Sequence, residues 1–277
     1  MDLYRDALNI LKETSRTFYI PIVRLPVGLQ EAVASAYLCF RAIDEIEDHP
    51  ELDNPTKAKF LRTISSTLQE SGVDGFSIDT FSLGLNTHEN LLPEVSIRIR
   101  EWTLLAPATI APRIWDATAA MADRMAHWAE VNWEIRTESD LNHYTFSVAG
   151  AVGLLLSDLW AWYDGTQTNR SLAIGFGRGL QVVNMLRNHT EDLSRGVDFF
   201  PQGWDAENMQ KYARRNLAMA GAYTNALPAG PALDFCQVPL TLAYGTLNAL
   251  ESGKAKLTRS DVLALIEPLI GVNMNAI

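Results

Sequence analysis

The sequence predicts an all-α protein. Apolar residues recur three and four positions apart over most of the chain, which is the spacing of one helix face. Period-two alternation of any length, the pattern of a half-buried strand, is absent from the sequence. The predicted helices cover residues 28–47, 56–70, 111–134, 139–163, 169–193, 206–224, 233–251 and 259–270.

Turn and capping residues separate these helices. Asp53-Asn54-Pro55 and Thr258-Arg259-Ser260-Asp261 are typical helix starts, while Gly165, Gly203 and the segment 228–231 are typical breaks. The sequence contains no Ser/Gly tract, no repeat and no low-complexity run that would mark a linker. We therefore expect one domain over residues 1–277, a helical bundle with a central hydrophobic cavity of the kind in which bundles hold ligands.

Composition excludes several functions. The net charge of −10, with no basic stripe, argues against nucleic-acid binding, because phosphate backbones are bound by clustered Lys and Arg. Cys39 and Cys236 have no C-x-x-C partner, which argues against zinc and a disulfide framework. The start of the chain lacks a signal-peptide pattern, and no stretch approaches about 18 uninterrupted apolar residues. These features predict a soluble, cytoplasmic protein.

Two acidic stretches, 41–48 and 184–192, dominate the candidate site residues. On a helix, Asp44 and Asp48 lie one turn apart on one face, and the same holds for Asn184, Asn188 and Asp192. Two facing rows of oxygen ligands suit Mg²⁺ ions that share their coordination with a diphosphate. A solvated helix face is the alternative. The apolar segments that lead into both stretches favour the metal interpretation, because half-buried carboxylates need pairing or coordination.

These motifs carry a resemblance. The segments Ser15-Arg16-Thr17-Phe18 with Leu25-Pro26, then 37–48, 144–153 and 181–192 occur in the order of the squalene/phytoene synthase family, and the chain resembles that family from about residue 6 to about residue 265. The late segment Phe235-Cys236-Gln237-Val238-Pro239-Leu240 is more similar to squalene synthases than to phytoene synthases. The resemblance implies a class I isoprenoid synthase fold.

The resemblance also implies roles for residues. It implies that metal is held by Asp44, Asp48, Asn184, Asn188 and Asp192, with Glu45, Glu47 and Glu191 orienting these ligands. It implies substrate contacts from Ser15, Arg16, Phe18, Arg41, Tyr144, Gln181 and Arg187. Of these residues, we expect Asp44, Asp48, Asp192, Tyr144 and Arg41 to take part in catalysis.

The arginines have a simpler alternative. Arg41 with Glu45, and Arg187 with Glu191, are spaced for intrahelical ion pairs worth about 0.3–0.5 kcal/mol each. Against this, cationic groups are expected to hold the diphosphate oxygens that metals leave free. The two interpretations are nearly even for Arg187, and the resemblance favours substrate binding for Arg41.

Three further features have structural interpretations. Residues 175–179 contain three glycines but lack both the spacing and the preceding strand of a nucleotide-binding loop, so we expect them to permit close helix packing. His189 is expected on a helix surface. The tryptophan-rich segment 115–162 is expected mainly in the core, with a few rings lining the cavity, where an aromatic face stabilises a carbocation.

The implied activity is a Mg²⁺- or Mn²⁺-dependent prenyltransferase that joins two farnesyl-type diphosphates head to head toward a squalene-like hydrocarbon. NADPH use is left open. Asn188 replaces the family's usual aspartate, which weakens the second row for two successive ionisations. The alternatives are prenyl transfer from one allylic diphosphate to a small, for instance aromatic, acceptor, a single-substrate terpene cyclase, and a catalytically silent helical protein. Product release suggests peripheral membrane contact.

Overall fold

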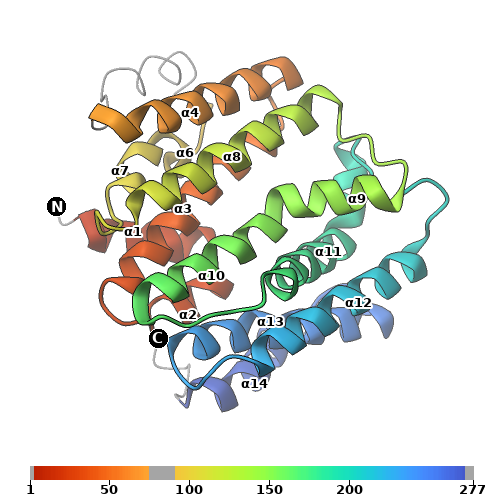
Figure 1. The fold of residues 1–277 in the computed structure, drawn as a ribbon. Coiled ribbons are helices and arrows are strands. Elements are labelled where there is room, and N and C mark those ends of the chain that lie inside the picture. The colour runs from red at the N-terminus through yellow and green to blue at the C-terminus, as the bar shows by residue number, and fades with distance from the viewer. Residues whose placement is uncertain (1–2, 75–90, 272–277) are drawn as a thin grey trace. The chain divides into compact units, whose positions relative to one another are not determined.

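The computed structural model describes residues 3–74 and 91–271. These residues form helices and no strand (Figure 1), which confirms the all-α prediction. The helices are α1 (Leu3–Thr14), α2 (Arg16–Ile22), α3 (Leu29–Glu47), α4 (Asn54–Asp74), α6 (Glu94–Ile97), α7 (Ile99–Thr103), α8 (Ala111–Glu130), α9 (Glu138–Thr145), the π-helix η2 (Phe146–Gly150), α10 (Ala151–Asp164), α11 (Arg170–Ser194), α12 (Ala206–Asn225), α13 (Pro231–Glu251) and α14 (Arg259–Ile270).

The chain divides into two compact units. The first unit comprises Met1–Glu134 and Ala161–Gly165, and the second comprises Ile135–Trp160 and Thr166–Ile277. A single domain over residues 1–277, with a central cavity, stays a prediction.

Helix α3 is the centre of the first unit. It contacts α1, α4, α6, α7 and α8, and its inner residues are almost wholly buried, as its long apolar sequence requires. Two buried hydroxyl groups tie it to its neighbours: Ser35 Oγ donates to the Trp102 carbonyl at 2.7 Å, and Ser96 Oγ donates to the Ala42 carbonyl at 2.8 Å. These contacts fix α3 along its length.

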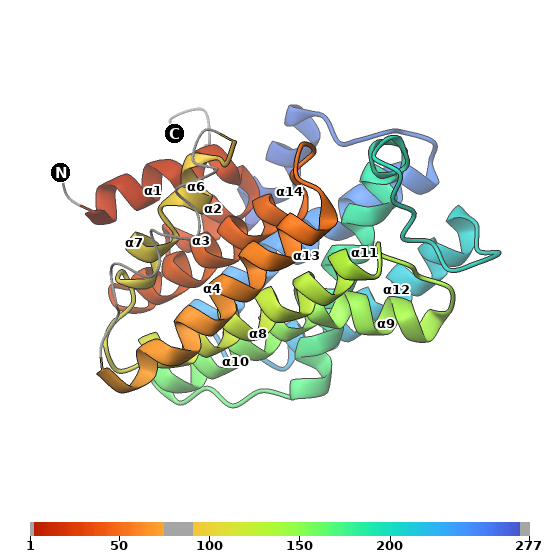
Figure 2. The same ribbon diagram turned by 90° about the horizontal axis from the view of Figure 1, so that it is seen from above.

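Helices α4 and α8 lie side by side (Figures 1 and 2), and Arg62 of α4 bridges Asp123 and Glu130 of α8. Helix α8 ends at Glu130, not at the predicted residue 134. The reason is the backbone, because Asn132 and Trp133 have positive φ values of 54° and 49°. Left-handed residues cannot continue a right-handed helix.

Helix α11 is the centre of the second unit. It contacts α9, η2, α12 and α13, while α13 also contacts α14. The backbones approach most closely at glycines. A Cβ atom on Gly177 would lie 2.0 Å from the Ala149 carbonyl oxygen, and a Cβ on Gly179 would lie 3.0 Å from the Leu217 amide nitrogen. This confirms that the glycine-rich segment 175–179 serves close helix packing.

The helical run formed by α9, η2 and α10 has membrane-like length. Over Glu138–Asp164, 27 residues, it is long and apolar enough to cross a membrane, which the sequence interpretation did not single out. In its most apolar window, 56% is buried inside the protein, as in the core helix of a soluble protein. Length and composition therefore do not assign this helix to a membrane, and the cytoplasmic location stays a prediction.

Candidate functional site

The first predicted row lies on one face of α3. Tyr37, Arg41, Asp44 and Glu45 are half-buried and Asp48 is exposed, whereas all the residues between them except the half-buried Phe40 are buried. Arg41 donates from Nη1 to Asp44 Oδ2 at 2.9 Å and from Nη2 to Glu45. Burial lowers the pKa of Arg41, but the charges of Asp44 and Glu45 outweigh it, so the pKa is raised. Arg41 therefore forms the expected ion pair with Glu45 and a further ion pair with Asp44.

The Ser15–Phe18 segment lies beside this row. Ser15 caps α2 by accepting a hydrogen bond from the Phe18 amide at 3.2 Å, which orients the first turn. The Phe18 ring packs on Tyr37 at 5.6 Å between centroids, one turn before Arg41. Burial raises the pKa of Tyr37, against hydrogen bonds with Ser15 and Thr14 that lower it. Arg16 begins α2, and its side chain lies outside the described part of the structure.

Glu47 lies on the buried flank of the same turn. It is only 3% exposed, and its Oε1 accepts a hydrogen bond from the Trp133 indole at 2.8 Å. Burial raises the pKa of Glu47 well above its ordinary value, the Asp48 charge raises it further, and the Trp133 hydrogen bond works in the opposite direction. Glu47 is therefore buried beside the row, whereas Glu45 belongs to its half-buried face.

The second predicted row lies on the last turns of α11. Arg187 donates from Nη2 to Asn184 Oδ1 at 2.6 Å and from Nε to Asn188 Oδ1 at 3.1 Å. The Asn188 amide also donates to Asn184 Oδ1 at 3.4 Å. Arg187 therefore donates hydrogen bonds to the side-chain oxygens of two residues of the predicted metal row. These bonds replace the expected ion pair between Arg187 and Glu191. Gln181 is half-buried one turn earlier.

Asp192 is the last residue of this row, and its carboxylate forms an ion pair with the Arg195 guanidinium. It is 5% exposed and accepts from Arg195 Nη2 at 2.5 Å. The sequence interpretation missed Arg195, although its position three residues after Asp192 was a usable signal. Glu191 is exposed. Each predicted row in this structure therefore carries guanidinium groups on its oxygen atoms.

Two aromatic stacks involve the end of α11 and the segment that follows it. The buried Tyr144 ring stacks on Phe199 at 4.8 Å between centroids, and His189 stacks on Phe200 at 3.8 Å. His189 Nε2 also lies 3.3 Å from Asp198 Oδ1. Tyr144 is thus brought to the segment that follows Asp192. The sequence interpretation missed this segment, because stacking between α9, α11 and a loop leaves no local pattern.

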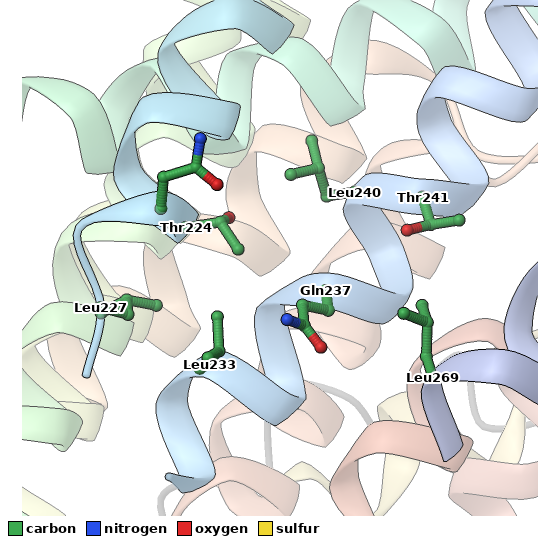
Figure 3. A pocket seen from close by; sticks show the side chains of 8 residues that line it. Thr224, Leu227, Leu233, Gln237, Leu240, Thr241 and Leu269 are labelled. Atoms are coloured by element: carbon green, nitrogen blue, oxygen red, sulfur yellow. The ribbon is translucent and has the colours of Figure 1, made fainter. Parts of the chain in front are cut away.

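A pocket in the second unit contains none of the predicted site residues. It has a volume of about 440 Å³ and lies among α12, α13 and α14 (Figure 3). Its wall includes Leu227, Leu233, Leu240 and Leu269, with the polar Thr224 and Gln237. Among the described residues that line it there is no carboxylate, so this lining does not suit a metal and diphosphate.

The donor set suits Mg²⁺ in its chemistry. Both rows offer hard oxygen ligands, and each already binds cationic guanidinium groups. Among the described residues, no three His, Cys, Asp or Glu side chains gather around one point. Mg²⁺ usually takes one or two carboxylates together with substrate phosphates, so a larger protein cage is not required. The two rows belong to different units.

Comparison with known proteins gives the family. The family model described as squalene/phytoene synthase matches residues 11–209. Curated relatives include squalene synthase of Schizosaccharomyces pombe, 29% identical over 89% of this chain and 59% of that protein. Another is squalene synthase of Dictyostelium discoideum, 28% identical over 87% of this chain and 62% of that protein. The chain therefore spans about three fifths of the length of these relatives.

Solved structures show the same fold. TcSQS bound to a ligand has a TM-score of 0.78 at 20% identity and matches 96% of this chain and 85% of that chain. A dehydrosqualene synthase in complex with a ligand has a TM-score of 0.64 at 17% identity and matches 97% of this chain and 95% of that chain. With the family model matching most of its length, the chain belongs to the squalene/phytoene synthase family.

Proposed function

We propose that this chain is a Mg²⁺-dependent prenyltransferase that joins two farnesyl-type diphosphates head to head toward a squalene-like hydrocarbon. The observation that carries the proposal is the pair of oxygen rows on α3 and α11, each holding guanidinium groups, in a member of the squalene/phytoene synthase family. Oxygen atoms that bind a guanidinium group can also bind a divalent cation. The arginine that the cation displaces can then bind a phosphate oxygen.

The metal ligands we propose are Asp44, Asp48, Asn184, Asn188 and Asp192. Bound Mg²⁺ stabilises the charge of the departing diphosphate, which is the difficult part of ionising an allylic substrate. Arg41 and Arg187 would turn from their oxygen partners toward the diphosphate. Mn²⁺ offers the same oxygen chemistry and is expected to substitute.

The reaction balances as follows. The carbon–oxygen bond of one allylic diphosphate breaks, and diphosphate leaves with the electron pair. The double bond of the second prenyl diphosphate supplies the pair for the new carbon–carbon bond, and a proton is lost. Arg41 and Arg187 hold the leaving diphosphate by charge and hydrogen bonds. Tyr144, buried against Phe199, offers an aromatic face that stabilises a nearby cation. Conversion to squalene would further require that the remaining diphosphate leave with its electron pair and that a reductant of the NADPH type supply a hydride.

One observation favours a second candidate. Asn188 is neutral and shares Arg187 with Asn184, so the α11 row offers a single carboxylate, Asp192. A row with one carboxylate binds divalent metal more weakly, which suits one ionisation better than two. Prenyl transfer to a small aromatic acceptor needs only one ionisation, and so does cyclisation of a single substrate. For either candidate function, peripheral contact with a membrane would provide a route for release of an apolar product.

The test is release of inorganic diphosphate from an allylic prenyl diphosphate and from its saturated analogue, with Mg²⁺, with Mn²⁺ and with EDTA. The proposal predicts metal-dependent release from the allylic substrate alone, because only that substrate gives a stabilised cation. Equal release from both, or full release in EDTA, contradicts ionisation. Release that occurs only when an aromatic acceptor is added supports the second candidate.

A further inference from the structure

The turn after α8 is strained. Asn132 and Trp133 are consecutive non-glycine residues with φ values of 54° and 49°. Asn tolerates the left-handed region, but a bulky aromatic residue is an outlier there. The turn is held by the Trp133 amide, which donates to the Trp128 carbonyl at 2.9 Å, and by Asn54 Nδ2, which donates to Asn132 Oδ1 at 3.0 Å. Strain kept in place by such contacts points to a use for the conformation.

The left-handed turn places the Trp133 side chain inside the first unit. Trp133 is 7% exposed, and its indole Nε1 donates to Glu47 Oε1 at 2.8 Å. The Lys57 ammonium lies 5.1 Å from the Trp133 ring centroid, in cation–π geometry, and Lys57 is also only 7% exposed. A carboxylate, an indole and an ammonium thus form one buried cluster from α3, α4 and the turn after α8.

This cluster adjoins the first oxygen row through Glu47. Glu47 is the last residue of α3, next to Asp48 and less than one turn from Asp44. Asp48 caps the helix, where the chain would otherwise fray. A buried contact at Glu47 therefore restrains the turn that presents both aspartates, as outer partners do for metal ligands in general.

We propose that Trp133 and Lys57 are positioning residues, which fix Asp44 and Asp48 for metal and diphosphate through Glu47. The inference rests on the proposed function, because it concerns the metal of that same site. The alternative is that the cluster stabilises the fold and nothing more.

Trp102 provides a matched control in the same unit. It is fully buried, its indole donates to the Val95 carbonyl at 2.8 Å, and the Arg98 guanidinium lies 4.6 Å from its ring centroid. Trp102→Phe and Trp133→Phe therefore each remove one buried indole hydrogen bond from a ring that also contacts a cationic side chain. Only the bond lost in Trp133→Phe is made to a side chain on the last turn of α3.

The experiment measures Mn²⁺ affinity by electron paramagnetic resonance, with inorganic pyrophosphate present, for wild type and both variants of the full chain. Thermal unfolding is recorded for each protein. The expected result is roughly 10-fold weaker Mn²⁺ binding for Trp133→Phe, the lower end of the effect of outer partners. Binding by Trp102→Phe should stay within about twofold of wild type at a similar loss of thermal stability.

The outcomes separate the two claims. Wild type that binds no Mn²⁺ with pyrophosphate overturns the proposed function and the inference with it. Wild type that binds, with Trp133→Phe and Trp102→Phe unchanged alike, overturns the inference alone. Lys57→Met is the second variant, because it keeps both the indole hydrogen bond and the aliphatic packing; unchanged Mn²⁺ affinity in this variant also counts against the inference.

Discussion

A close approach of two backbones in the second unit allows the effect of Gly177→Ala to be predicted. The new Cβ would lie 2.0 Å from the Ala149 carbonyl oxygen and 3.0 Å from Gly150 Cα. Both obstructing atoms are backbone, so no side-chain rotation relieves the contact. The segments α11 and η2 would have to separate by more than about 1 Å, because buried atoms are already packed at van der Waals distance.

The magnitude follows from two opposing terms. Forcing extra volume into a packed core costs about 1–3 kcal/mol, with more where backbone must move. Alanine in a helix regains about 1 kcal/mol over glycine. Because the obstructing atoms are backbone, we take the upper end of the cost, about 3 kcal/mol, and expect a net loss of about 2 kcal/mol. For a domain of this size each kcal/mol lowers the melting temperature by about 2–4 °C, so the expected fall is roughly 4–8 °C.

The matched control is Gly221→Ala in α12, where the nearest atom to the new Cβ is the Tyr244 hydroxyl at an ordinary 3.6 Å. This variant should be neutral or more stable by up to about 1 kcal/mol. Differential scanning calorimetry of both variants checks the pair. Equal melting temperatures for Gly177→Ala and wild type would refute the close approach of α11 and η2.

Three other predictions concern the site and its surroundings. Asp44→Asn or Asp48→Asn should lower turnover at least about 100-fold, the scale for losing a preorganised electrostatic group, in steady-state assays with saturating Mg²⁺; full activity of the double variant would remove the metal role. Asn188→Asp should lower the Mg²⁺ concentration for half-maximal rate without changing the product, because an added carboxylate attracts the cation; an unchanged Mg²⁺ profile contradicts this. Hydrogen bonds from Thr137 lower the pKa of Asp140 in the folded protein. The stabilisation of the folded state by ionised Asp140 is therefore complete above its unfolded pKa of about 3.9 and is lost as pH falls through its folded pKa. Acid unfolding followed by circular dichroism should show a weaker pH dependence in Asp140→Asn.

The sequence predicted the long helices well, because each buries an apolar stripe with helical period. It did not predict the short helices α2, α6 and α7, which span too few turns to show a period. It also missed α1, although Leu3, Ala7, Ile10 and Leu11 follow the spacing of one helix face. The end of α8 was wrong for a different reason. Trp133 continues the apolar pattern, but its backbone turns left-handed and delivers the ring to Glu47, a residue far away in the sequence.

The candidate site was predictable within each helix and not beyond it. The row on α3 and the row on α11 follow from residues three and four apart. The partners of these residues come from elsewhere: the Phe18 ring on Tyr37, the Phe199 ring on Tyr144 and the indole on Glu47. Such contacts depend on tertiary packing, which local periodicity does not encode.

The central claim is that both oxygen rows serve the condensation of two prenyl diphosphates. The most direct measurement is the mass of the products formed from farnesyl diphosphate alone, with Mg²⁺ over a wide concentration range and no added acceptor. We predict presqualene diphosphate, or a thirty-carbon hydrocarbon when NADPH is supplied, and no such product from Asp44→Asn or Asp192→Asn. Failure of the wild-type protein to form any thirty-carbon product, at every Mg²⁺ concentration, would contradict it.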